Sequence, residues 1–143
     1  TACKCCLYKV VRVRPMTFSH AIWLAIGGGL GTLVRASVAI LALRLCGREF
    51  PWGTFAVNLI GSFLFGVIVS LGRGRMGLPA GYETILLVGF LGGFTTYSSF
   101  AFQSYEFFEQ GKPFLAGAYI VGTVVSGLVL VWSGVIVGRL GGG

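Results

Sequence analysis

Four long apolar runs dominate this chain and constrain its fold more than any other feature. They extend over about residues 18–43, 50–71, 84–105 and 113–138, and Arg35 is the only Lys, Arg, Asp or Glu within them. A run of about twenty apolar residues is typical of a transmembrane helix, because that length spans the hydrocarbon core of a bilayer. Helices are expected rather than open strands, since lipid offers the backbone no hydrogen-bond partners. The sequence therefore predicts an all-α membrane protein with four transmembrane helices per chain, surrounded by the lipid bilayer.

The composition excludes a soluble globular domain. Hydrophobic residues make up 55% of the chain and charged residues only 10%, whereas soluble domains are about a quarter charged. Glycine is frequent, at 24 of 143 residues. Glycines four residues apart let membrane helices approach closely, although chance spacing in a glycine-rich chain is an open alternative. The pairs at this spacing are Gly27 with Gly31, Gly89 with Gly93, and Gly134 with Gly138.

The charge balance is basic, with 11 Lys and Arg residues against 4 acidic residues and a formal net charge of +7. Such an excess occurs in proteins that bind nucleic acids, membrane surfaces or anionic substrates. Here the cations lie in short connections and form no basic face, so we expect no nucleic-acid partner. No carboxylate lies deep in a run, and no Ser/His/Asp set, acid pair or nucleotide loop is present, so we do not expect an enzyme.

Residues 1–15 differ from the rest of the chain, because they are basic and contain three of the four cysteines. The interpretation that we favour makes Met16 the natural start and residues 1–15 spurious upstream sequence. The alternative is a genuine basic arm on the membrane surface. The cysteine cluster lacks a second ligand pair and His20 is the only histidine, so we expect no metal site there. Residues 16–143 then form the four-helix transmembrane domain.

The positive charges do not favour one orientation in the membrane. With four spans, both termini share a side with the second connection, and from Met16 onward each side carries three cations. The positive-inside rule then has no preference, so two copies of opposite orientation can pair about a two-fold axis in the membrane plane. The two groups are Arg73, Arg75 and Arg139 on one side, and Arg44, Arg48 and Lys112 on the other.

Polar side chains inside the first two runs are candidates for function, because they are costly in lipid. Asn58 lies near the middle of the second run, and its amide offers two donors and one acceptor. The alternative role for Asn58 is a structural hydrogen bond between helices. Arg35 lies about two-thirds along the first run, where it either extends to the interface or lends positive potential to a water-filled mouth.

The third run contains an unusual polar stretch around residues 92–100. Adjacent glycines, two threonines and two serines favour a broken helix, whose free carbonyls suit a cation and whose hydroxyls and amides suit an anion. Tyr97 and Phe100 share a helical face, and the positive edges of their rings can flank an anion. Ordinary core aromatics with hydroxyl groups bonded back to the helix are the alternative. In the fourth run, Tyr119, Thr123 and Ser126 share a face, as a polar track or as interhelical contacts.

Taken in order, these residues resemble the Fluc/CrcB family of fluoride channels. The resemblance covers about residues 20–138 and rests on one motif in each of the first three runs. The motifs are Gly28-Gly29-Leu30-Gly31 with Arg35, then Gly53-Thr54 with Asn58 and Gly61-Ser62-Phe63, and then the stretch from Gly89 to Phe100. The resemblance implies an antiparallel, dual-topology homodimer with a broken third helix. It also implies a multi-pass protein of the bacterial inner membrane that passively exports fluoride and lowers cytoplasmic fluoride.

The resemblance also assigns roles to individual residues. Asn58 matches the pore asparagine, and Tyr97 and Phe100 match paired phenylalanines whose edges line the fluoride path, with Ser98 and Ser99 between them. Arg35 matches a vestibule arginine. The remaining assignments are Tyr119 and Thr123 on the polar track of the fourth helix, and the carbonyls of Gly92 and Thr95 at a structural sodium ion in the dimer centre.

The chain departs from the family pattern at two positions. Tyr97 stands where phenylalanine is usual, and Gln103 stands where glutamate is usual, with Glu106 nearly one turn later. Neither change removes a hydrogen-bond donor from the expected path.

Two other classes of membrane protein are alternatives. A proton-coupled multidrug exporter of four short spans needs a membrane-embedded carboxylate, which these runs lack. A scaffold without transport activity needs only the glycine spacings and leaves the polar residues of the second and third runs unexplained.

Overall fold

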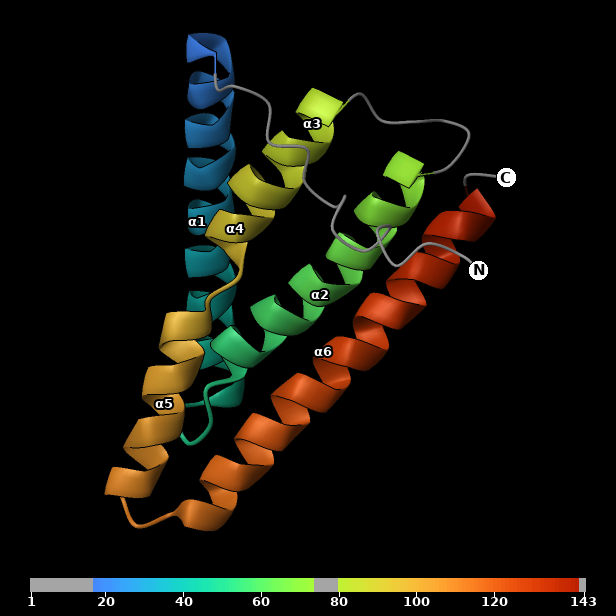
Figure 1. Cartoon of the computed structure of the whole chain (residues 1–143). Coiled ribbons are helices and arrows are strands. Elements are labelled where there is room, and N and C mark those ends of the chain that lie inside the picture. Colours follow the sequence, from blue (N-terminus) through green and yellow to red (C-terminus); the bar gives the residue numbers. More distant parts are fainter. Residues whose placement is uncertain (1–16, 74–79, 142–143) are drawn as a thin grey trace.

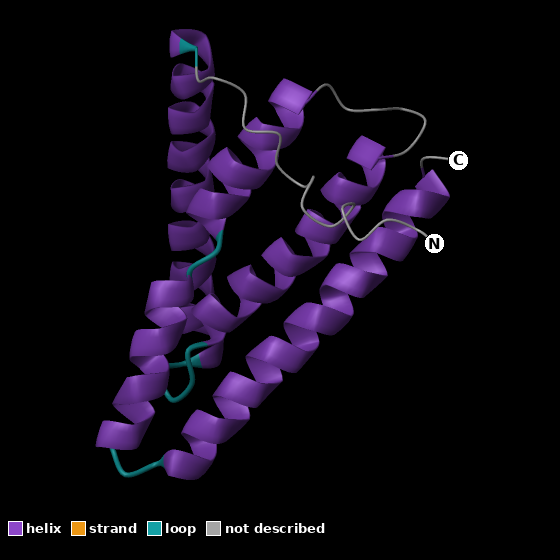
Figure 2. Cartoon of the chain, viewed as in Figure 1, coloured by secondary structure: helices purple, strands orange, loops and turns teal. Residues whose placement is uncertain are grey.

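The computed structural model describes residues 17–73 and 80–141 (Figure 1). Within them every regular element is helical, as Figure 2 shows. The elements are α1 (Phe18–Cys46), α2 (Trp52–Arg73), α3 (Ala80–Thr84), the π-helix η2 (Ile85–Leu91), α4 (Gly92–Phe94), α5 (Tyr97–Glu109) and α6 (Pro113–Gly141). The predicted extension over residues 1–15 lies outside the described residues, and so does Arg75.

Within the described residues, four helical stretches are long and apolar enough to cross a membrane, which confirms the predicted number of spans. They are residues 18–46, 52–72, 81–109 and 113–141, and the third contains α3, η2, α4 and α5. The first and fourth helices continue past Arg44 and Arg139, which lay beyond the predicted ends. A basic side chain in the last turn suits the negative end of the helix dipole and extends toward the interface, so it does not end the helix.

Local sequence signals set the ends of the helices. The Thr17 hydroxyl accepts a hydrogen bond from the His20 backbone N–H at 3.4 Å and caps α1. Gly47 follows α1 and Gly111 lies between α5 and α6, with φ angles of 78° and 70° that favour glycine. Pro113 begins α6, where its missing N–H costs no helical hydrogen bond.

The helices pack in two pairs. Figure 1 shows α6 running beside α2, while α1 lies against η2 and α4, and these pairs make the main contacts between elements. One cluster of buried apolar side chains joins α2 to η2 and α4, and it includes Val57, Leu91 and Phe94. A second cluster around Tyr119 joins α5 and α6 near their connection. The third span is therefore held by α1 and α2 in its first half and by α6 in its second.

Close contact between the paired helices depends on glycine. A Cβ added at Gly31 would overlap the Phe90 carbonyl oxygen, and one added at Gly93 would overlap the Gly28 oxygen. In the other helix pair, a Cβ at Gly134 would overlap the Phe63 oxygen. At all six glycines of the predicted pairs, an added Cβ would come within 3.3 Å of another helix. The prediction that these spacings mark helix contacts is confirmed.

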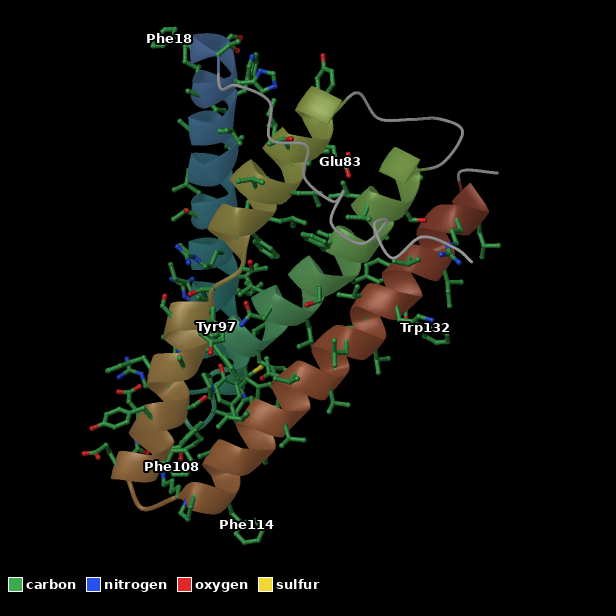
Figure 3. The ribbon with its side chains drawn as sticks, in the orientation of Figure 1. Phe18, Glu83, Tyr97, Phe108, Phe114 and Trp132 are labelled. Carbon is green, nitrogen blue, oxygen red and sulfur yellow. The ribbon has the colours of Figure 1, made fainter. Side chains whose placement is uncertain are left out.

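Large apolar side chains cover the outside of the helices. Leu33, Leu128 and Trp132 are each about two-thirds exposed, at 66%, 68% and 67%. Figure 3 shows Trp132 and Phe114 on α6 pointing away from the other helices. A surface this apolar is unfavourable in water and favourable in lipid or against another membrane protein.

The close approach of α1 to η2 predicts different effects at two neighbouring glycines. Gly31→Ala should lower the free energy of unfolding by about 1–3 kcal/mol, the usual cost of overpacking, because the new methyl group meets backbone atoms that cannot rotate away. Gly29→Ala is the matched control, since a Cβ there meets nothing within 4 Å. The thermal unfolding midpoint of the protein in detergent measures both changes. Equal midpoints for the two variants would contradict the close contact.

Candidate functional site

Two residues with extended backbone separate α4 from α5 inside the third span. Thr95 has φ −86° and ψ 159°, and Thr96 has φ −148° and ψ 110°. Figure 2 shows this short loop between the two helices. The end of α4 and the beginning of α5 therefore leave carbonyl and N–H groups without helical partners, at a depth where lipid supplies none.

Asn58 on α2 pairs with the backbone of Thr96. Its Nδ2 donates to the Thr96 carbonyl oxygen at 3.2 Å, and the Thr96 N–H donates to its Oδ1 at 2.9 Å. The structural hydrogen bond left open from the sequence is therefore present. Nδ2 carries two hydrogens and donates only one of them to Thr96, so its second hydrogen takes part in neither of these two bonds. Asn58 satisfies the interrupted backbone and still keeps a donor.

The threonine and serine side chains around the loop complete the helix ends. Thr96 Oγ1 accepts from the Ser99 N–H at 3.2 Å, which caps α5, and donates to Ser99 Oγ at 2.9 Å. Thr95 Oγ1 donates back to the Leu91 carbonyl oxygen at 2.9 Å. Bonding of a hydroxyl group back to the helix, the alternative given above, thus accounts for Thr95, whereas Thr96 caps the following helix.

A groove of about 480 Å³ lies beside this loop. Helices α2 and α6 and the third span all contribute side chains to it, and none of the residues that line it is charged. It brings together six of the ten predicted site residues: Asn58, Gly92, Thr95, Tyr97, Phe100 and Thr123.

The other four predicted residues lie elsewhere. Arg35 on α1, Ser98 and Ser99 do not line the groove, and Ser98 is exposed at the start of α5. Tyr119 is 1% exposed and belongs to the second apolar cluster. Its hydroxyl donates to Gln103 Oε1 at 3.0 Å, which directs it away from the groove and toward α5.

The two aromatic rings of the third span differ in their surroundings. The centroids of Tyr97 and Phe100 are 6.0 Å apart, with the planes tilted by 54°. Figure 3 shows Tyr97 where α4 gives way to α5, and its side chain is 81% exposed. Phe100 is half-buried, and its ring lies 5.2 Å from that of Tyr119. Phe100 is therefore held by packing, whereas Tyr97 extends outward beside the groove.

Thr123 has a buried hydroxyl group that lacks a partner. The residue is 8% exposed, and its Oγ1 makes no hydrogen bond within the described residues. A buried polar group without a partner costs about 1–3 kcal/mol. Thr123 also lines the groove, so this hydroxyl belongs to a residue at its wall.

Backbone carbonyls at the end of α4 suit a cation. The last carbonyls of a helix have no intrahelical partner and carry its negative partial charge, and hard cations prefer oxygen ligands. Gly92 and Thr95, the predicted sodium ligands, both line the groove. A cluster of three or more His, Cys, Asp or Glu side chains is absent from the described residues.

Gly61 supports the loop in a way that we did not predict. A Cβ at Gly61 would overlap the Thr95 side-chain methyl group, so glycine at this position leaves room for the loop against α2. The signal was available, because Gly61 follows Asn58 by three residues and shares its helical face.

The paired hydrogen bonds predict the effect of a nearly isosteric change. Asn58→Asp keeps an acceptor for the Thr96 N–H but replaces the donor to the Thr96 carbonyl with a second oxygen. We expect a loss of about 1–3 kcal/mol in unfolding free energy. Lowering the pH should restore part of this loss, because a protonated carboxyl can donate. Thermal unfolding in detergent at two pH values measures both effects. A midpoint equal to that of the unmodified protein at neutral pH would contradict the paired arrangement.

Comparison with known proteins agrees with the resemblance found in the sequence. Residues 22–135 match the family described as CrcB-like protein, Camphor Resistance (CrcB). The fluoride-specific ion channel FluC of Agrobacterium fabrum is 41% identical over 115 residues, covering 80% of this chain and 92% of the relative. The FluC channel of Nitrosococcus oceani is 40% identical over 118 residues, covering 82% and 94%. The chain therefore belongs to the CrcB family, whose members are channels rather than enzymes.

Proposed function

We propose that this protein is a fluoride-selective channel that lets fluoride leave the cell passively, and that the groove beside the α4–α5 loop is part of its path. One observation carries the proposal. A remaining Asn58 donor, the Tyr97 and Phe100 rings and the unpartnered Thr123 hydroxyl border the same uncharged space. The relatives named fluoride-specific ion channels support the choice of ion.

The chemistry of the groove suits a small, strongly hydrated anion. Fluoride leaves its water shell only if hydrogen-bond donors and positive ring edges replace it. An amide, a hydroxyl and two aromatic edges supply such groups without a fixed positive charge. A fixed cation in a narrow path would hold fluoride too tightly, since conduction requires binding weak enough for release.

Passive transport follows from what the groove lacks. No carboxylate lines it, so it offers no group that could exchange protons against a substrate. This argues against the proton-coupled multidrug exporter. The alternative of a scaffold without transport activity does not explain why the buried Thr123 hydroxyl lacks a partner within the described residues. We place the protein in the bacterial inner membrane, where passive efflux lowers cytoplasmic fluoride.

We further propose that two copies pair in opposite orientations. The even distribution of cations from Met16 onward and the apolar outer faces of the helices support this arrangement. The broken third helix of the proposal corresponds to the extended pair Thr95 and Thr96. Carbonyls of Gly92 and Thr95 would hold a structural sodium ion between the copies, where it would offset the repulsion between anions in neighbouring paths.

Purified protein in liposomes tests the proposed function directly. Liposomes loaded with potassium fluoride should release fluoride rapidly when valinomycin balances the charge, and liposomes loaded with potassium chloride should not release chloride. An ion-selective electrode measures each release, and protein-free liposomes are the control. Chloride release as fast as fluoride release would contradict the proposal of a fluoride-selective channel.

The two rings of the third span provide a matched pair of variants. Tyr97→Phe keeps a positive ring edge in an exposed position, so fluoride release should stay within roughly tenfold of the unmodified rate, equivalent to about 1.4 kcal/mol. Phe100→Leu removes the ring between Tyr97 and Tyr119 and should slow release by more than roughly tenfold. The unfolding midpoints should show that both variants fold. Small and equal effects would mean that the rings only pack.

A further inference from the structure

A second pocket, of about 490 Å³, lies at the end of the bundle where α1 connects to α2 and α5 connects to α6. The proposed path does not account for it. Its lining differs from that of the groove, because it contains four charged side chains as well as polar ones. The charged residues are Arg48, Glu49, Glu106 and Lys112, and Gln103 is among the polar ones.

Tyr119 lies between the groove and this pocket. Its hydroxyl donates to Gln103 Oε1, and Gln103 lines the pocket. Its ring lies 5.2 Å from that of Phe100, which lines the groove. Thr123, also on the groove, is one helical turn further along α6. Tyr119 therefore contacts a residue of the groove through its ring and a residue of the pocket through its hydroxyl.

The rings around Tyr119 separate the two spaces. Phe50 and Phe107 lie 5.2 Å and 6.0 Å from Tyr119, both nearly perpendicular to its ring, and both line the pocket. The pocket thus has an aromatic floor toward the groove and a charged rim formed by the two connections.

The charges of the rim are available to act on an ion. Within the described residues, no ion pair or hydrogen bond engages the side chains of Arg48 or Lys112. The first turn of α2 also lines the pocket and adds the positive end of a helix dipole. Glu49 and Glu106 oppose this potential.

We propose that this pocket is a mouth of the fluoride path, in which Arg48 and Lys112 concentrate a small inorganic anion and Glu106 opposes its entry. The inference rests on the proposed function and adds residues that control the rate. A charged mouth raises the local concentration of the opposite ion and thereby its rate of entry. In this proposal the uncharged groove determines which anion passes, and the pocket affects only how fast it enters.

The test uses substitutions that remove one charge of either sign. Lys112→Gln should slow fluoride release by roughly twofold to fivefold, and Glu106→Gln should speed it by a similar factor, as expected for one charge near the ion in water. The connection between α5 and α6 should stay folded after the Lys112 substitution, because the hydrogen bonds of Lys112 there are made by its backbone. Its N–H donates to the Phe107 carbonyl oxygen at 2.9 Å, and its carbonyl oxygen accepts from the Ala116 N–H at 3.1 Å. Arg44→Gln is the control, since Arg44 lies at the same end of the bundle outside the pocket.

Ionic strength provides the second readout. Release is measured from liposomes at about 0.01 M and about 1 M potassium gluconate, where the screening length falls from about 30 Å to about 3 Å. The opposite effects of Lys112→Gln and Glu106→Gln should be largest at low salt and should vanish at high salt. Arg44→Gln should change the rate by less than Lys112→Gln.

The outcomes separate this inference from the proposed function. If the unmodified protein releases fluoride selectively but both variants change the rate in the same direction, the mouth assignment is wrong. It is also wrong if the effects persist at high salt or if Arg44→Gln matches Lys112→Gln, because the pocket would then have no special role. If the unmodified protein releases no fluoride, the proposed function itself fails.

Discussion

The pair of hydrogen bonds between Asn58 and Thr96 is the interaction on which the rest of the site depends. A transmembrane helix that stops and restarts leaves unpaired backbone groups in lipid, and each such group costs several kcal/mol. The Asn58 side chain satisfies both backbone groups of Thr96, because it donates to the carbonyl oxygen and accepts from the N–H. The loop can therefore exist at this depth, and the groove lies beside it.

Glycine allows the close helix packing on which the Asn58–Thr96 hydrogen bonds depend. The loop approaches α2 closely enough for Asn58 to pair with Thr96 only because Gly61 leaves room for the Thr95 side chain. On the other side, Gly31 and Gly93 bring α1 against the helical turns just before the loop. Both contacts involve small residues in lipid, where packing rather than water exclusion favours helix association. The many glycines of this chain thus have a structural reason that composition alone does not reveal.

The groove and the pocket differ in charge. The groove has no charged lining residue, while the pocket at the end of the bundle has four. An uncharged passage suits release of a strongly hydrated anion, whereas charges act best on ions that still keep their water. Tyr119 lies between the two regions, with its hydroxyl toward the pocket and its ring against Phe100.

The sequence by itself determined the membrane class, the four spans, the close contacts at the glycine pairs and the family, because hydropathy, span length and residue spacing act locally along a helix. It also singled out Asn58 and Thr123, but as residues with two open roles each. Only the tertiary structure decided that Asn58 pairs with Thr96, 38 residues away, and that the Thr123 hydroxyl finds no partner among the described residues. Likewise, Tyr119 shares a helical face with Thr123, yet it turns toward Gln103. The physical reason is that hydrogen-bond partners in lipid come from neighbouring helices, and helix packing is not encoded in the spacing of any single helix.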